Sequence, residues 1–120
     1  MTYQEMKSLL NSVDNPIEKL EMVMDFGKDL LPVPVNAKCA EIIGCSSFVE
    51  ICRVGNNFFA KADSALVRGI VAIIISMVNG KSVQDIKKMD LRKEFNTLNL
   101  NLGASRLNGV NSMISFLENL

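Results

Sequence analysis

The sequence has no histidine among its 120 residues, and this absence excludes several common mechanisms. Catalytic triads with histidine, cysteine–histidine nucleophile pairs and zinc sites with imidazole ligands all need that side chain. Histidine acid–base chemistry is excluded for the same reason. Any nucleophile of this chain must therefore act without a histidine of the same chain.

Excess charge of either sign is also missing, because 13 Lys and Arg balance 13 Asp and Glu. Nucleic-acid-binding proteins carry clustered basic residues, and no such cluster occurs here, so we expect no nucleic-acid partner. Long apolar runs are lacking as well. The longest covers residues 70–75, whereas a span of the bilayer needs about 20 apolar residues, so we expect no membrane segment.

Cysteine is scarce, with only Cys39, Cys45 and Cys52 present. The first residues show no cationic region followed by an apolar one, so neither a secretory signal nor a transit peptide is expected, and the expected location is the cytoplasm. Three cysteines cannot all pair within one chain, and a reducing cytosol keeps thiols reduced. We therefore expect three free thiols and no disulfide.

The pattern of apolar residues predicts a single domain over residues 1–120, a length that allows a well-buried core. Helical spacing predicts helices over residues 3–10 and 17–31, the second capped by Asn15 with a proline at its first position. Pro32 then begins an extended loop that continues to residue 43.

The middle of the chain predicts a β-hairpin followed by a central buried helix. Residues 47–54 and 58–61 are rich in β-branched, aromatic and other apolar residues, and Gly55 opens the turn between them. Residues 65–78 are mostly apolar and end before an Asn-Gly pair, which is typical of a helix stop. This order indicates an α+β fold with helices over one face of a small antiparallel sheet.

The last third of the chain predicts three helices. Short helices begin near Ser82 and Asp90, residues 96–103 form an exposed loop, and the last helix begins near Ser105. One face of the last helix is apolar and is expected to pack on the domain: Val110, Met113, Ile114, Leu117 and Leu120.

Cys45 follows Gly44 where the predicted loop meets the first strand, and this placement makes it a candidate nucleophile. Glycine permits backbone conformations that could present the thiol at a loop tip. A reactive thiol must be partly exposed, and its surroundings must stabilise the thiolate. Free cysteine is also among the most buried residue types, so these two residues alone leave reactivity and simple packing both open.

Four segments that occur in order resemble the SufE family of sulfur-acceptor proteins. The segment IGCSSFV contains the Gly-Cys-x-Ser-x-Val pattern of the family, and LGASRLNG contains its Ser-Arg-x-Asn/Gln-Gly pattern ahead of the last helix. The other two are LEMVMDFGKDLLP and ADSALVRG, the latter followed by the apolar helix and GKSVQDI. Together they cover about residues 16–120.

This resemblance implies a SufE/IscU-like fold with about three strands and a defined function. Cys45 occupies the position that accepts persulfide sulfur from a cysteine desulfurase, for iron–sulfur cluster assembly. The chain would be a non-enzymatic carrier and desulfurase activator without a cofactor of its own, since pyridoxal phosphate resides in the partner. The implied partner is a SufS-type desulfurase. A SufBCD-type scaffold as recipient and a homodimer are further hypotheses that the sequence leaves open.

Asp63 and Arg106 lie where the family places residues near its acceptor cysteine. A guanidinium close to Cys45 would favour the thiolate, whereas a carboxylate would oppose it. Asp63 could also cap the helix that begins at residue 65, and Arg106 could hold a loop in place.

The other two cysteines support competing hypotheses. Cys52 lies in a predicted strand and suits ordinary packing, whereas Cys39 could be exposed and could resolve or compete with a Cys45 persulfide. An iron–sulfur scaffold built from all three cysteines is an alternative function, although their spacing matches no compact ligand motif. A plain adaptor domain with unreactive thiols is another.

Overall fold

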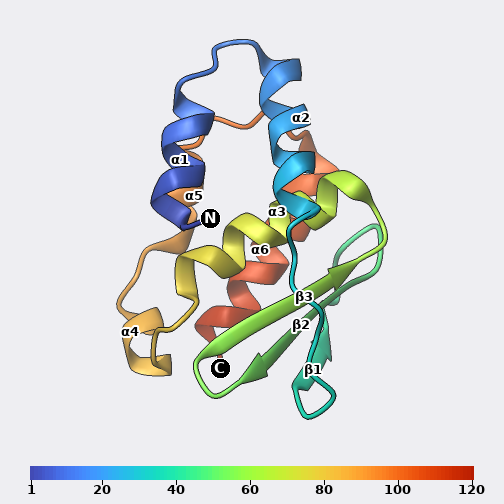
Figure 1. Cartoon of the computed structure of the whole chain (residues 1–120), viewed down its shortest axis with the longest axis vertical. Helices are drawn as coiled ribbons and strands as arrows, with labels where there is room; N and C mark the ends of the chain where they lie inside the picture. Colours follow the sequence, from blue (N-terminus) through green and yellow to red (C-terminus); the bar gives the residue numbers. More distant parts are fainter.

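Three antiparallel strands form a sheet in the spatial order β1-β2-β3, and helices lie behind it in the view of Figure 1. The computed structural model describes residues 1–120, and none of its helices combines the length and apolar character needed to cross a membrane. The α+β prediction is confirmed, with elements α1 (Tyr3–Asn11), α2 (Pro16–Gly27), β1 (Lys38–Glu41), β2 (Val49–Val54), β3 (Asn57–Ala62), α3 (Ala65–Val78), α4 (Val83–Lys87), α5 (Leu91–Asn96) and α6 (Ala104–Glu118).

The β2–β3 hairpin is the one that the sequence predicts. Val54 pairs with Asn57, so the turn consists of Gly55 and Asn56, and Gly55 has a φ of 58°, which favours glycine. The core-facing side chains alternate along both strands, as in any half-buried sheet: Val49, Ile51, Phe58, Ala60 and Ala62.

Strand β1 lies within the segment for which the sequence predicts only an extended loop, so that prediction was incomplete. It pairs with β2 from Lys38 opposite Arg53 to Glu41 opposite Glu50. It is an edge strand, and of its four residues only Ala40 is half-buried. Because both faces of this strand are largely exposed, its sequence has no alternating apolar pattern. The strand is recognised only from its pairing with β2.

Cys39 and Cys52 form a disulfide between β1 and β2, so the prediction of three free thiols was wrong. The two residues lie directly opposite each other in the register, with their Cα atoms 4.0 Å apart. This contact could not be inferred from spacing, since it requires β1 to be a strand. Cys45 remains the free thiol of the chain.

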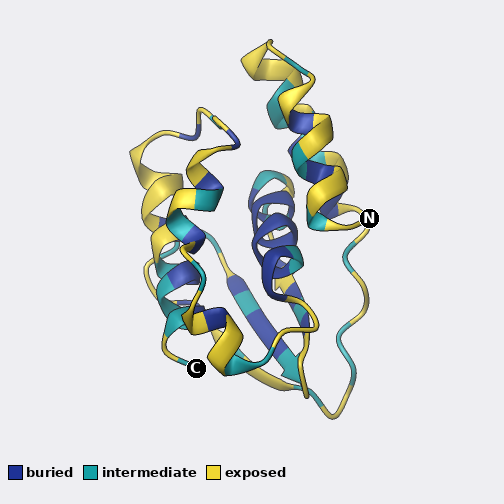
Figure 2. Cartoon of the chain, turned by 90° about the vertical axis from the view of Figure 1, so that its left-hand side faces the viewer, coloured by how far each residue is buried: buried dark blue, intermediate teal, exposed yellow.

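Helix α3 is the centre of the core and is buried along most of its length (Figure 2). It packs closely on α2 through two glycines. A Cβ atom at Gly27 would lie 2.7 Å from the Gly69 amide nitrogen, and one at Gly69 would collide with the Val23 carbonyl. Helix α2 ends at Gly27, before the predicted residue 31, since this contact needs a glycine and glycine weakens a helix.

The capping residues confirm most of the predicted helix starts. The predicted cap of α3 was wrong. Asn15, Ser82 and Asp90 accept hydrogen bonds from the first turns of α2, α4 and α5. The cap of α3 is Ser64, whose hydroxyl accepts from Val67, and not Asp63.

The segment between α5 and α6 is only partly the exposed loop that its polar residues predict. Leu98 and Leu102 are 0% and 4% exposed, so two apolar side chains anchor the segment in the core. The apolar stripe of α6 is buried as predicted at Val110, Met113, Ile114 and Leu117. Helix α6 therefore holds a fixed position behind the sheet, and its first turns face the β1–β2 loop.

Candidate functional site

The loop between β1 and β2 carries Cys45. The Ile42 amide donates to the Val49 carbonyl, at 2.8 Å, and this bond closes the base of the loop. Gly44 has a φ of 100°, a conformation that other residues rarely adopt. A side chain at Gly44 would also collide with Ser112 of α6. The glycine before Cys45 is thus required both by the turn and by the close approach to the helix.

The Cys45 thiol rests against the backbone of α6. Its S–H donates to the Gly109 carbonyl oxygen at an Sγ–O distance of 3.7 Å, and the side chain is half-buried. A Cβ atom at Gly109 would lie 3.3 Å from Sγ. The glycine of the family-like Ser-Arg-x-Asn-Gly segment therefore leaves the space in which the sulfur lies.

A small cavity of about 10 Å³ adjoins the thiol. A volume of about 10–15 Å³ on this measure is what one water molecule needs. The cavity is lined by Cys45, Ser46, Ser47, Val67, Ile70, Ser105, Arg106, Gly109 and Met113. Cys45 and Arg106 therefore share one cavity. The family resemblance predicts that these two residues are neighbours.

Burial raises the pKa of the Cys45 thiol above its ordinary value. Desolvation disfavours the charged thiolate, and the neutral S–H donates to a carbonyl instead of accepting from a donor. Arg106 is exposed on the first turns of α6 and forms no ion pair. The resting thiol is consequently protonated at neutral pH and a weak nucleophile.

Asp63 lies outside the Cys45 cavity, at the end of β3. Its amide donates to the Phe48 carbonyl at 3.3 Å, which ties the far end of the Cys45 loop to β3. Its side chain is exposed and lines a separate cleft of about 480 Å³. Arg68 lines the same cleft and donates twice to the Ala62 carbonyl. A role of Asp63 in the environment of the thiol stays a prediction.

Sequence reasoning missed three residues that shape this site: Ser47, Gly109 and Ser112. The Ser-Arg-x-Asn/Gln-Gly pattern contains Gly109 but does not indicate that this glycine leaves room for the sulfur. The Gly-Cys-x-Ser pattern contains the only local signal for Ser47. Nothing in the sequence indicates Ser112, because its contact with the loop is purely tertiary.

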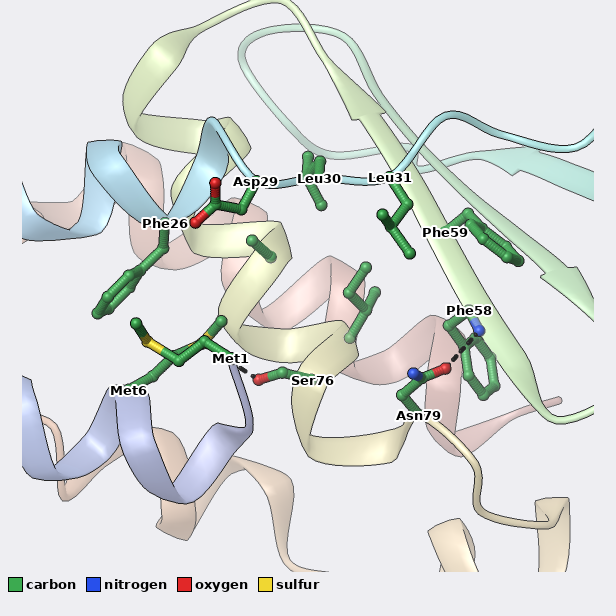
Figure 3. Close-up of a pocket in the computed structure, with 12 residues that line it drawn as sticks. Met1, Met6, Phe26, Asp29, Leu30, Leu31, Phe58, Phe59, Ser76 and Asn79 are labelled. Carbon is green, nitrogen blue, oxygen red and sulfur yellow. Dashed lines mark hydrogen bonds between the residues drawn. The ribbon is translucent and has the colours of Figure 1, made fainter.

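A third hollow, of about 130 Å³, lies between α1, α2, α3 and β3 and does not include Cys45 (Figure 3). Its polar lining residues are Asp29, Ser76 and Asn79. Ser76 donates to the Ile73 carbonyl, and Asn79 accepts from the Phe58 amide. These polar groups hold the fold together, so we locate the candidate chemistry at Cys45.

Comparisons with known proteins identify the family of the chain. The family model described as SufE, Fe-S metabolism associated domain, matches residues 4–120. The chain is 30% identical over 105 residues to the sulfur acceptor protein CsdE of Escherichia coli (strain K12), covering 80% of this chain and 71% of that protein. It is 28% identical over 117 residues to the cysteine desulfuration protein SufE of Wigglesworthia glossinidia brevipalpis, covering 90% of this chain and 81% of that protein.

Two further similarities extend the comparison. SufE-like protein 1 of Arabidopsis thaliana is 29% identical over 125 residues, which cover 96% of this chain but only 33% of that longer protein. The solution structure of a hypothetical protein from Thermus thermophilus superposes with a TM-score of 0.66, covering 99% of this chain and 94% of the other. At 15% identity this second similarity shows a shared fold alone.

Proposed function

Because the chain belongs to the SufE family of Fe-S metabolism associated domains, we propose that Cys45 accepts persulfide sulfur from a cysteine desulfurase. The observation that carries the proposal is the position of the free thiol, on a glycine-containing loop that rests against α6. The names of the relatives CsdE and SufE, a sulfur acceptor and a cysteine desulfuration protein, support it. The accepted sulfur then passes toward iron–sulfur cluster assembly.

The transfer is a thiol exchange. The Cys45 thiolate attacks the outer sulfur of the desulfurase persulfide, a new S–S bond forms at Cys45, and the desulfurase cysteine leaves as a thiolate. The outer sulfur keeps its proton, so charge and electrons balance without an external oxidant. The carbon–sulfur bond of the substrate is broken earlier, at pyridoxal phosphate in the partner. This chain acts as a carrier and activator rather than an enzyme.

Activation of the thiol requires the loop to leave α6. Burial raises the pKa of Cys45 in the resting position, whereas a solvated thiol near a cation forms its thiolate more readily. Gly44 supplies a flexible point next to the cysteine, and Arg106 supplies a nearby positive charge. Binding of the desulfurase is therefore the step that turns a protected thiol into a nucleophile.

Exposed apolar residues in the same loop suit contact with that partner. Ile43 is 80% exposed and Phe48 is 37% exposed, on either side of Cys45. Apolar side chains presented next to a reacting atom provide binding energy in a protein interface. The proposed partner is a SufS-type desulfurase, with a SufBCD-type scaffold as recipient. The proposed location is the cytoplasm, where the Cys39–Cys52 disulfide would have to withstand cellular reductants. A homodimer stays a prediction.

The disulfide weakens the alternative of an iron–sulfur scaffold. With Cys39 and Cys52 paired, one thiol remains, whereas an iron–sulfur cluster usually takes four protein ligands. The plain-adaptor alternative predicts that Cys45 is unreactive in the native protein.

The test combines the chain with a cysteine desulfurase and cysteine and then measures the mass of the intact chain. The proposal predicts a gain of one sulfur atom that a reductant removes, together with faster desulfurase turnover. Cys45→Ser is the matched control and should gain no sulfur. A wild-type chain that never gains sulfur would sink the proposal.

A further inference from the structure

Ser47 carries a buried hydroxyl without a hydrogen-bond partner. Its Oγ is shielded from solvent, and no donor or acceptor of the protein lies within hydrogen-bonding distance. Buried hydroxyls are nearly always satisfied, and an unsatisfied one destabilises the fold. No other side-chain oxygen or nitrogen of the chain is in this position. An unsatisfied hydroxyl in the loop between β1 and β2, called the acceptor loop below, calls for a functional explanation.

The position of Ser47 provides that explanation. It lies two residues after Cys45, and both side chains line the cavity of about 10 Å³. The resting thiol bonds to Gly109 and not to Ser47. Ser47, whose hydroxyl has no partner within the protein, therefore lines the same small space as the residue to which sulfur is added.

A persulfide at Cys45 supplies the missing acceptor. The added sulfur extends the side chain by one atom, and the adjoining cavity of about 10 Å³ supplies part of the space that this atom needs. An ionised outer sulfur accepts hydrogen bonds, and bonds to charged acceptors are stronger than neutral ones. Arg106, which lines the same cavity, adds a positive charge.

We propose that Ser47 donates a hydrogen bond to the outer sulfur of a Cys45 persulfide and holds it in this cavity until the recipient protein removes it. The inference rests on the proposed function and assigns a residue to the storage step that follows the transfer. No group of the protein forms a hydrogen bond with this hydroxyl in the resting structure, and the persulfide is the acceptor that we assign to it.

Ser47→Ala separates this role from a structural one. If the hydroxyl served only the resting fold, its removal would lower the melting temperature and leave the persulfide unaffected. Our inference requires the opposite result. The variant should melt at or above the wild-type temperature, because an unsatisfied buried group is gone, and it should lose its persulfide sulfur faster.

The experiment loads wild type, Ser47→Ala, Ser47→Thr and Ser8→Ala with a desulfurase and cysteine, removes the desulfurase, and adds a dithiol. The dithiol releases the outer sulfur as sulfide and becomes a disulfide, and intact mass follows the loss. Loss of one hydrogen bond to a charged acceptor should make discharge of Ser47→Ala roughly tenfold faster. Ser8→Ala is the matched control because Ser8 is exposed on α1 and does not line the cavity, and Ser47→Thr keeps the hydroxyl.

The outcomes distinguish the two proposals. A wild-type chain that takes up no sulfur overturns the proposed function and this inference with it. If the wild type loads but Ser47→Ala discharges at the same rate, only the role of Ser47 is overturned. The same holds if Ser8→Ala discharges as fast as Ser47→Ala, or if Ser47→Ala loses stability while its persulfide persists.

Discussion

The Cys45 Sγ atom lies 3.7 Å from the Gly109 carbonyl oxygen, and this contact joins the acceptor loop to α6. It connects two segments, Gly-Cys-x-Ser and Ser-Arg-x-Asn-Gly, that are far apart in the sequence. Because the thiol donates to a carbonyl, the contact stabilises the protonated form. The resting arrangement therefore protects Cys45.

Gly109→Ala should loosen the loop. The new Cβ atom would lie 3.3 Å from Sγ, so the thiol must move away from α6. Overpacking of about 1 kcal/mol would raise alkylation of Cys45 by iodoacetamide roughly fivefold. Asn111→Ala, at an exposed position of the same helix, is the control and should alkylate at the wild-type rate. An unchanged rate in Gly109→Ala would contradict the described contact.

The pH dependence of alkylation should reflect burial of the thiol. Since burial raises the pKa of Cys45, the midpoint of the rate profile should lie above that of a free cysteine, about 8.5. The folded chain binds this proton more tightly than the unfolded chain, so stability should fall as pH rises above about 8.5. Denaturation curves of wild type and Cys45→Ser should diverge in that range, and parallel curves would oppose this account.

The Cys39–Cys52 disulfide should contribute to stability. It joins residues 13 apart in sequence, and closing a loop of about 15 residues is worth about 3 kcal/mol in the chain-entropy model. Urea denaturation with and without a reductant should show a difference of this order. The double variant Cys39→Ser/Cys52→Ser should be insensitive to the reductant. Equal stability of the oxidised and reduced wild type would contradict the prediction.

Arg106→Gln should slow the reaction of Cys45 modestly. Arg106 lines the cavity of the thiol and is exposed. A nearby exposed charge of this kind is worth up to about 1 kcal/mol, so alkylation should slow by roughly twofold to fivefold. The difference should disappear at high ionic strength. Lys93→Gln removes an exposed charge elsewhere, and a similar slowing in that variant would show that Arg106 has no special effect.

The local features of the fold could be predicted from the sequence. The apolar run of α3 and its end before Asn79 are properties of neighbouring residues, as are the Asn15 and Ser82 caps. These signals act within one or two helical turns. The elements that they define appear in the structure with small shifts at their ends.

The missed features depend on contacts between distant segments. Strand β1 is short, exposed and without alternation, so only its pairing with β2 reveals it, and the pairing of Cys39 with Cys52 follows from that register. The Gly-Cys-x-Ser motif was enough to choose Cys45 as the candidate nucleophile from the sequence. The unsatisfied hydroxyl of Ser47 and the cavity beside it required the position of α6.

The central claim is that the Sγ atom of Cys45 receives the transferred sulfur. The most direct test of this claim is to locate the added sulfur atom in the chain. The loaded chain is blocked with an alkylating reagent without reduction, digested and analysed by mass spectrometry. We predict the extra sulfur on the peptide that contains Cys45, with Cys39 and Cys52 still joined by their disulfide. Extra sulfur on Cys39 or Cys52, with an unmodified Cys45, would contradict the account.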